Sequence, residues 1–131
     1  MLPKNLKYDK NYSWIKVDGD IAEVGIIEPA AKKVKEFVFI ALPDKGSMIK
    51  RGETYASLEA VKWSGHLPSP VSGKIIEVNE QLFDTPSNIN SSPYSSWIMR
   101  VKLSNRKELE ELMSSEEAEK FYEIKNEKVR A

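Results

Sequence analysis

The sequence contains no cysteine and only one histidine among its 131 residues. Without cysteine, the chain itself cannot form a disulfide, a cysteine-ligated metal site or a thiol nucleophile. A single imidazole leaves little material for a metal site or for a histidine-based catalytic group. We therefore expect no metal site, and any redox chemistry of this protein would need a reactive group that is supplied from outside the chain.

Net charge and long apolar runs are also lacking. The 20 basic and 20 acidic side chains cancel, so no excess positive charge favours nucleic acid or an anionic membrane. No stretch approaches the length of a membrane-spanning helix, and the first ten residues, MLPKNLKYDK, lack the apolar core of a signal peptide. These absences predict a soluble, cytoplasmic protein that binds neither nucleic acid nor membrane.

The sequence does contain a series of short apolar segments separated by turn residues. Residues 14–17 and 21–26 flank Asp-Gly-Asp, and an Asp-Gly pair between apolar runs is a strong signal for a β-hairpin. EFVFIALP is rich in aromatic and β-branched residues and closes with Pro43, which is typical of a strand. Further apolar segments with glycine-containing turns lie on both sides of residues 61–63, and WIMRVKL predicts a late strand.

Helical segments are fewer. IEPAAKKVK predicts a short helix with Pro29 in its first turn, where no backbone donor is needed. Residues 104–123 predict two C-terminal helices with serine or asparagine N-caps. Residues 124–131 are expected to form a frayed tail. Residues 84–96 predict an irregular polar loop. The expected fold is mainly β with C-terminal helices (α+β), in a single domain that spans residues 1–131.

Lys62 lies between Val61 and Trp63 in LEAVKWSGHLPSPVSGKIIEV, where the pattern predicts the tip of a hairpin. From these residues alone, three roles are open. Lys62 can be an ordinary surface lysine. It can also be a catalytic lysine whose pKa is lowered by burial, although its neighbours supply few partner groups. The third role is covalent modification, in which the long side chain becomes the root of a tether.

The order and spacing of these segments resemble a known family. GSMIKRGETYASLEAVK followed by PxxGKIIEV resembles the lipoyl domains, in which a lysine at a hairpin tip carries lipoate. The resemblance extends to the H-protein family of the glycine cleavage system, from residue 8 to about residue 123. The segments that carry it are YDKNYSWIKVDGDIAEVGI, FVFIALPDKGSMIKRGE, the segment from LEAVK to SPVSGKIIEVNEQL, and INSSPY. Biotinyl domains share this hairpin but usually flank the lysine with methionine, whereas Val61 and Trp63 are the flanking residues here.

The resemblance implies a lipoyl/biotinyl-type hammerhead sandwich of two small antiparallel sheets, with lipoate attached covalently to Lys62. It implies a carrier subunit without catalytic activity of its own, whose swinging arm shuttles an aminomethyl intermediate among the P, T and L proteins of glycine cleavage. A lipoate-attaching enzyme is a further implied partner. Glu59 either helps that enzyme to recognise the hairpin or is a solvated charge, and Gly73 is expected where the returning strand needs a residue without a Cβ.

Three positions depart from the family pattern. A His-Glu pair before the first tryptophan is Tyr12-Ser13 here, an acidic residue after the lysine is His66, and a histidine that opens the short helix is Pro29. In the family, the acidic groups are implied to hold an amine-bearing cargo. An ammonium group needs such carboxylates to offset the cost of its desolvation.

The loss of both acids leaves alternatives for the cargo. Other polar groups can take over the same task, or the cargo can be neutral or anionic. H-like lipoate-binding proteins work beside a heterodisulfide-reductase-like complex in sulfur oxidation, and a sulfur cargo needs no acidic clamp. His66 and Trp63 would then line a cargo site, although His66 is also explained as a plain turn histidine and Trp63 as a contact for the arm or a partner. A lipoyl donor or an unmodified scaffold is the third alternative.

Overall fold

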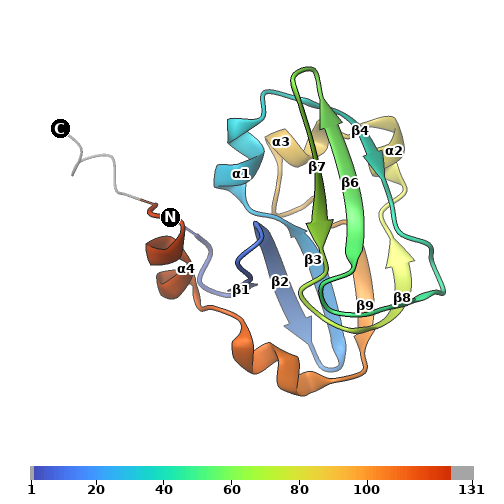
Figure 1. Ribbon diagram of the computed structural model, residues 1–131, viewed down its shortest axis with the longest axis vertical. Coiled ribbons are helices and arrows are strands. Elements are labelled where there is room, and N and C mark those ends of the chain that lie inside the picture. The colour runs from blue at the N-terminus through green and yellow to red at the C-terminus, as the bar shows by residue number, and fades with distance from the viewer. Residues whose placement is uncertain (1, 125–131) are drawn as a thin grey trace.

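Two antiparallel β-sheets form the centre of the computed structural model, which describes residues 2–124 (Figure 1). The larger sheet has six strands, in the order β1-β2-β3-β9-β8-β5. In chain order these are β1 (Lys7–Tyr8), β2 (Ser13–Asp18), β3 (Ile21–Ile26), β5 (Met48–Ile49), β8 (Gly73–Val78) and β9 (Met99–Leu103). The smaller sheet has the order β4-β6-β7. Its strands are β4 (Phe37–Ala41), β6 (Thr54–Ala60) and β7 (Trp63–Pro68). The mainly β fold with two antiparallel sheets is therefore confirmed.

The first hairpin forms where the Asp-Gly pair predicted it. Asp18 pairs with Ile21, so that only Gly19 and Asp20 connect β2 to β3. Gly19 has a φ of 64°, a left-handed conformation that glycine adopts without a steric cost. The local sequence alone is therefore enough to place this turn.

Short helices connect and cover the sheets. They are α1 (Glu28–Lys33), α2 (Gln81–Asp84), α3 (Asn88–Ser91), the 3₁₀-helix η1 (Arg106–Glu111) and α4 (Ser115–Phe121). α4 begins with a capping box, in which the side chains of Ser114 and Glu117 each accept the backbone N–H of the other residue. The serine N-cap expected from the sequence for the second C-terminal helix is therefore Ser114.

The first predicted C-terminal helix is present as the 3₁₀-helix η1, in which Glu108 donates to the carbonyl of Asn105, three residues back. One loop prediction needs correction. The predicted irregular loop at residues 84–96 contains α3. Ile89 is fully buried and anchors this short helix to the core, and one apolar residue in four gives no periodicity that could have revealed it.

Apolar side chains from both sheets meet in one core. Ile15 and Val24 of the larger sheet and Leu58 of the smaller sheet are buried in the same cluster. α2 and α3 each contribute one fully buried residue to this cluster, Leu82 and Ile89. This packing holds the smaller sheet against the larger one and leaves the far end of the β6–β7 hairpin extending from the body of the molecule (Figure 1).

A second apolar cluster joins the two ends of the described chain. Leu2 and Trp14 are buried with Ala118 of α4. Ile124 packs against this cluster, and its N–H donates to the carbonyl of Glu119 over 2.8 Å. The predicted fraying therefore does not begin at residue 124, and residues 125–131 lie outside the described part of the chain. None of the helices between residues 2 and 124 has the length and apolar character needed to span a bilayer.

Candidate functional site

Lys62 lies at the apex of the β6–β7 hairpin. Ala60 pairs directly with Trp63, so the connection consists of Val61 and Lys62 alone. Neither residue has a positive φ, and the Val61 side chain is 85% exposed. A two-residue connection between paired strands is stiff, so the root of the Lys62 side chain is held in one place. The tip of the β6–β7 hairpin lies at the top of the molecule in Figure 1, and Lys62 is exposed to solvent.

The exposed position of Lys62 at the hairpin tip argues against one of the three roles that the sequence left open for this residue, that of a catalytic lysine. A catalytic lysine needs a buried amine and nearby partner groups. Lys62 is exposed, and none of the ion pairs found between residues 2 and 124 includes it. An ordinary surface lysine and a modified lysine both fit this setting, and an exposed amine at a stiff tip is the geometry that a tether requires.

Trp63 faces the inner side of the smaller sheet. Its ring meets Phe37 edge-on with the centroids 5.8 Å apart, and 43% of the Trp63 side chain remains exposed. Beneath it lies a cavity of about 180 Å³ between α1 and the sheet, with Ala30, Leu58 and Leu67 in its walls. Among residues 2–124, Lys33 is the one charged residue in this lining, and no carboxylate takes part in it.

His66 does not share this cavity with Trp63. Side chains alternate between the two faces of a strand, and the two residues are three positions apart on β7. His66 therefore lies on the outer face, where its Nδ1 is 2.7 Å from the Oγ of Ser57 on the neighbouring strand. The predicted cargo site that combined His66 with Trp63 is not formed in this structure.

Glu59 lies on the same outer face, close to the tip. It pairs with Ser64 across the hairpin and with Phe39 of β4. The Glu59 side chain is exposed and takes part in none of the ion pairs among residues 2–124. This setting fits a solvated charge, and it also leaves the carboxylate accessible to a partner enzyme.

Ser13, the first residue of β2, is fully buried and does not line the cavity. Its Oγ lies 2.7 Å from the Oη of Tyr55, and its N–H donates to Oδ1 of Asp9 over 2.9 Å. Tyr12 does line the cavity with a half-exposed ring. Of the two residues that replace the His-Glu pair, only Tyr12 is therefore placed to meet a ligand in this cavity.

Asp9 is a buried carboxyl group that the sequence analysis missed. Oδ1 accepts the N–H groups of Asn11 and Ser13, whereas Oδ2 has no hydrogen-bond partner among the described residues. The hydroxyl of Tyr122 donates to the Asp9 backbone carbonyl and so ties α4 to this loop. Desolvation by burial raises the pKa of Asp9 from 3.8 to about 6, because the ionised form loses its hydration in this setting.

The Asp9→Asn variant should therefore be more stable than the wild type at pH 7. Between pH 3.8 and 6 the folded protein holds a proton that the unfolded chain has lost, so Asp9 makes the wild type less stable as the pH rises through this window. The difference between the folded and unfolded pKa values of Asp9 corresponds to a gain of about 3 kcal/mol in the free energy of unfolding of Asp9→Asn. Urea unfolding at pH 4 to 8 should show the advantage of Asp9→Asn growing up to pH 6 to 7 and then remaining constant.

The exposed carboxyl of Asp18, at the β2–β3 turn, provides a matched control. Asp18→Asn removes one exposed carboxyl at the far end of β2 without touching the buried surroundings of Asp9, so it should not reproduce the pH-dependent advantage of Asp9→Asn. An advantage of Asp9→Asn that does not change with pH would contradict the assignment to a buried, protonating Asp9.

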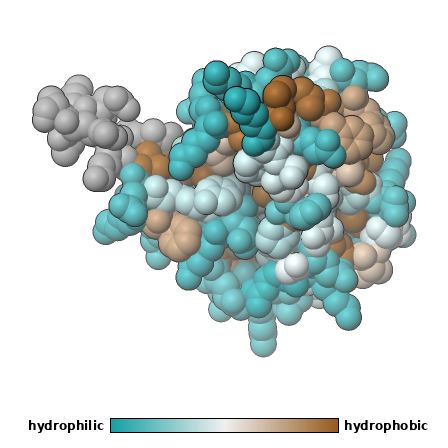
Figure 2. Space-filling view, turned by 45° about the horizontal axis from the view of Figure 1, so that its top comes forward, coloured by the Kyte–Doolittle hydropathy of each residue, from teal (hydrophilic) through white to brown (hydrophobic). Residues whose placement is uncertain are grey.

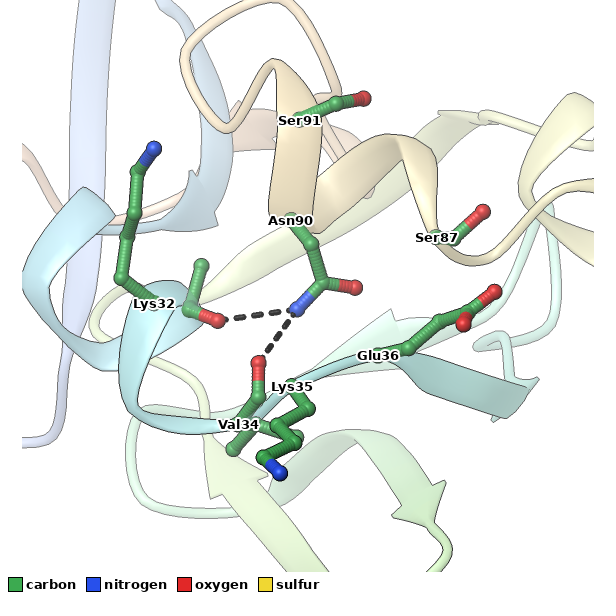
Figure 3. Close-up of a pocket in the computed structure, with 8 residues that line it drawn as sticks. Lys32, Val34, Lys35, Glu36, Ser87, Asn90 and Ser91 are labelled. Atoms are coloured by element: carbon green, nitrogen blue, oxygen red, sulfur yellow. Dashed lines mark hydrogen bonds between the residues drawn. The ribbon is translucent and has the colours of Figure 1, made fainter.

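Asn90 is a second residue that sequence reasoning missed (Figure 3). Its Nδ2 donates to the carbonyls of Ala31 and Val34 at the end of α1, over 2.9 and 2.8 Å, and its Oδ1 accepts the N–H of Phe37 at the start of β4. One side chain thus fixes the α1–β4 junction and, through Phe37, the contact with Trp63. The sequence shows no signal for this role, because Asn90 lies in a polar segment far from both partners.

The open pocket around Asn90 is lined mainly by polar and charged residues and has a volume of about 400 Å³. In Figure 3 the charged ends of Lys32, Lys35 and Glu36 point away from Asn90. The donor and acceptor atoms of the Asn90 side chain are already occupied by backbone groups. This pocket is therefore a structural junction and leaves the hairpin tip as the candidate site.

Known proteins resemble this chain over almost its whole length. The sequence model of the family described as Glycine cleavage H-protein matches residues 6–125. A glycine cleavage system H protein from Carboxydothermus hydrogenoformans is 43% identical over 128 residues, which cover 97% of this chain and 98% of that protein. A protein of the same name from Halothermothrix orenii is 44% identical over 123 residues, which cover 93% of this chain and 96% of that protein.

A solved structure agrees with these sequence matches. The crystal structure of a glycine cleavage system H protein from Mycobacterium marinum has a TM-score of 0.84 and 29% sequence identity, and the match covers 93% of this chain and 99% of that chain. This similarity confirms the lipoyl-type sandwich of two antiparallel sheets. The chain belongs to the glycine cleavage H-protein family.

Proposed function

We propose that this protein is the lipoate-bearing carrier of a glycine cleavage system, with lipoate joined to Lys62 through an amide bond. The observation that carries the proposal is an exposed lysine at the apex of a stiff two-residue hairpin. Membership of the glycine cleavage H-protein family supports it. The proposed partners are the P, T and L proteins of glycine cleavage and a lipoate-attaching enzyme, all in the cytoplasm.

The residues around Lys62 fit this group. The amine is free to be acylated, and acylation would replace a positive charge by a neutral amide. The pairs between β6 and β7, from Thr54–Pro68 to Ala60–Trp63, hold the root of the side chain on a rigid ribbon. When bound, lipoate would supply a cyclic disulfide that opens and closes with a change of redox state.

The rigid root and the flexible side chain together define the task of this chain. A tether that is anchored at one point presents its end to each partner at a high local concentration, without a new encounter for every step. The chain itself is proposed to be a carrier and not a catalyst. Its contribution is to anchor the arm and to expose it to partner enzymes.

One observation favours a second cargo. Among the described residues, the lining of the cavity beneath Trp63 contains Lys33 and no carboxylate, and the buried Ser13 does not belong to that lining. An ammonium-bearing cargo would find no counter-charge in this cavity, whereas a neutral or anionic sulfur cargo would need none. A carrier for sulfur oxidation, beside heterodisulfide-reductase-like enzymes, is therefore the second candidate, although the names of the relatives support glycine cleavage.

Mass spectrometry of the protein purified from its own host without reductant tests both candidates. We expect a lipoyl-sized mass increment that fragmentation places on Lys62. A further aminomethyl adduct would identify glycine cleavage as the pathway, and added sulfur would identify sulfur oxidation. An unmodified Lys62 would contradict the carrier function and leave a scaffold, whereas full modification without any cargo would be expected of a lipoyl donor.

A further inference from the structure

The strand β4 carries a bulge that reverses the direction of its side chains. Phe37 pairs with Ala60 and Phe39 pairs with Glu59, so two steps along β4 correspond to one step along β6, and Val38 is the extra residue. Phe37 is consequently buried, whereas Val38 and Phe39 are 54% and 45% exposed. A regular strand would have turned Phe39 toward the core. The bulge instead places two large apolar side chains next to each other on the surface.

These two side chains lie at the lysine end of the smaller sheet. Phe37 is level with the pair formed by Ala60 and Trp63, which is the last pair before the tip. Val38 follows it at once, and Val61 in the tip is 85% exposed. Figure 2 turns this end toward the viewer and shows brown and tan residues gathered at the upper right of the molecule. The strand register therefore places Val38, Phe39 and Val61, which together are called the apolar surface, at the same end of the smaller sheet as Lys62.

We propose that this apolar surface is the docking site of the enzyme that acylates Lys62. The proposal rests on the proposed function of Lys62 as a lipoate attachment site. The amine of a lysine reaches only about 6 Å from its own Cα, so an active site that acylates it must close around the tip and contact the side chains beside it. An enzyme that acts on the far end of the attached arm can remain at roughly twice that distance and does not need these contacts.

Other occupants fit the surface less well. A strand that extends the sheet from a partner would need a regular row of backbone donors and acceptors along β4, and the bulge at Val38 interrupts that row. A second copy of this chain on the surface would cover Lys62 and bring two positive tips together. Exposed apolar side chains that surround a reactive group instead suit a partner that holds them in a pocket of its own.

The decisive experiment measures acylation of the unmodified protein by a purified ATP-dependent lipoate ligase, with lipoic acid and ATP, followed by intact mass. The Val38→Ser/Phe39→Ser double variant should lose about tenfold or more in kcat/KM, mainly through a higher KM, as expected for loss of two contact residues. Met48→Ser is the matched control. Met48 is 66% exposed on β5 and lines the surface beside Thr54, where β6 begins, about 20 Å from the tip. Its kcat/KM should stay within about twofold of the wild type.

Further measurements make each outcome decisive. Thermal unfolding establishes that the double variant is folded when its rate is measured, and the single Val38→Ser variant takes its place in the assay if it is not. Wild-type kcat/KM in the folded double variant would overturn the docking site while leaving the proposed function intact. An absence of acylation at Lys62 in the wild type would instead remove the proposed function.

The identity of the occupant is tested on protein that has been fully lipoylated with excess ligase. Reduction of the attached arm by NADH and a dihydrolipoyl dehydrogenase should proceed at the same rate in the double variant and the wild type. A loss confined to this step, with normal acylation, would assign the surface to a downstream partner and overturn the proposed occupant.

Discussion

Replacing Lys62 with arginine should abolish both lipoate attachment and all carrier activity while leaving the fold unchanged. The guanidinium group keeps the positive charge and a similar length, but it stays protonated and offers no amine nucleophile for acylation. Lys62 is exposed and makes no ion pair among the described residues, so the free energy of unfolding should change by no more than about 0.5 kcal/mol. Intact mass after ligase treatment and glycine cleavage with purified P, T and L proteins provide the two readouts.

Lys74→Arg is a suitable control for this experiment. Lys74 is an exposed lysine on β8, where it pairs with Met48 and Lys102 and lies away from the hairpin tip. This variant should be acylated and should support carrier activity at wild-type rates. Carrier activity that survives in Lys62→Arg, or a lipoyl increment that moves to another lysine, would show that Lys62 is not the root of the arm.

The largest loss of stability from a single added methyl group is expected for Gly73→Ala. A Cβ at this position would lie 2.0 Å from the carbonyl oxygen of Lys102 and 2.7 Å from Cγ1 of Val101. The carbonyl belongs to the backbone of β9, the strand that pairs with β8, so relief requires the two strands to move apart. We expect a loss of at least about 3 kcal/mol, because overpacking against backbone cannot be relieved by a change of rotamer.

Gly19→Ala separates this steric effect from the loss of glycine itself. Gly19 has a φ of 64°, yet nothing lies within 4 Å of an added Cβ. Its substitution should therefore cost only the strain of a left-handed residue, on the order of 1 kcal/mol. Urea unfolding of both variants measures the difference directly. Equal losses in the two variants would mean that β8 and β9 can separate at little cost, which would contradict the close approach at Gly73.

Features that depend on neighbouring residues could be read from the sequence alone. The Asp-Gly pair specifies the β2–β3 turn through the conformational freedom of Gly19. The N-cap at Ser114 depends on the carboxylate three residues later, at Glu117. The position of Lys62 at a hairpin tip follows from two apolar segments around a short connection. In each case the determining interactions span only a few residues, so their chemistry is visible in the order of the amino acids.

Features that depend on distant residues were decided by the tertiary structure. Residue spacing along β7 places Trp63 and His66 on opposite faces, but only the packing of the core determined which face is buried. The bulge that exposes Phe39 arises from the pairing of β4 with β6, and Asn90 acquires its role from backbone groups more than fifty residues away. The sequence by itself determined the family, the sheets and the place of Lys62 at a hairpin tip. The surroundings of that lysine were decided by long-range packing, because burial and strand register depend on contacts that no local pattern records.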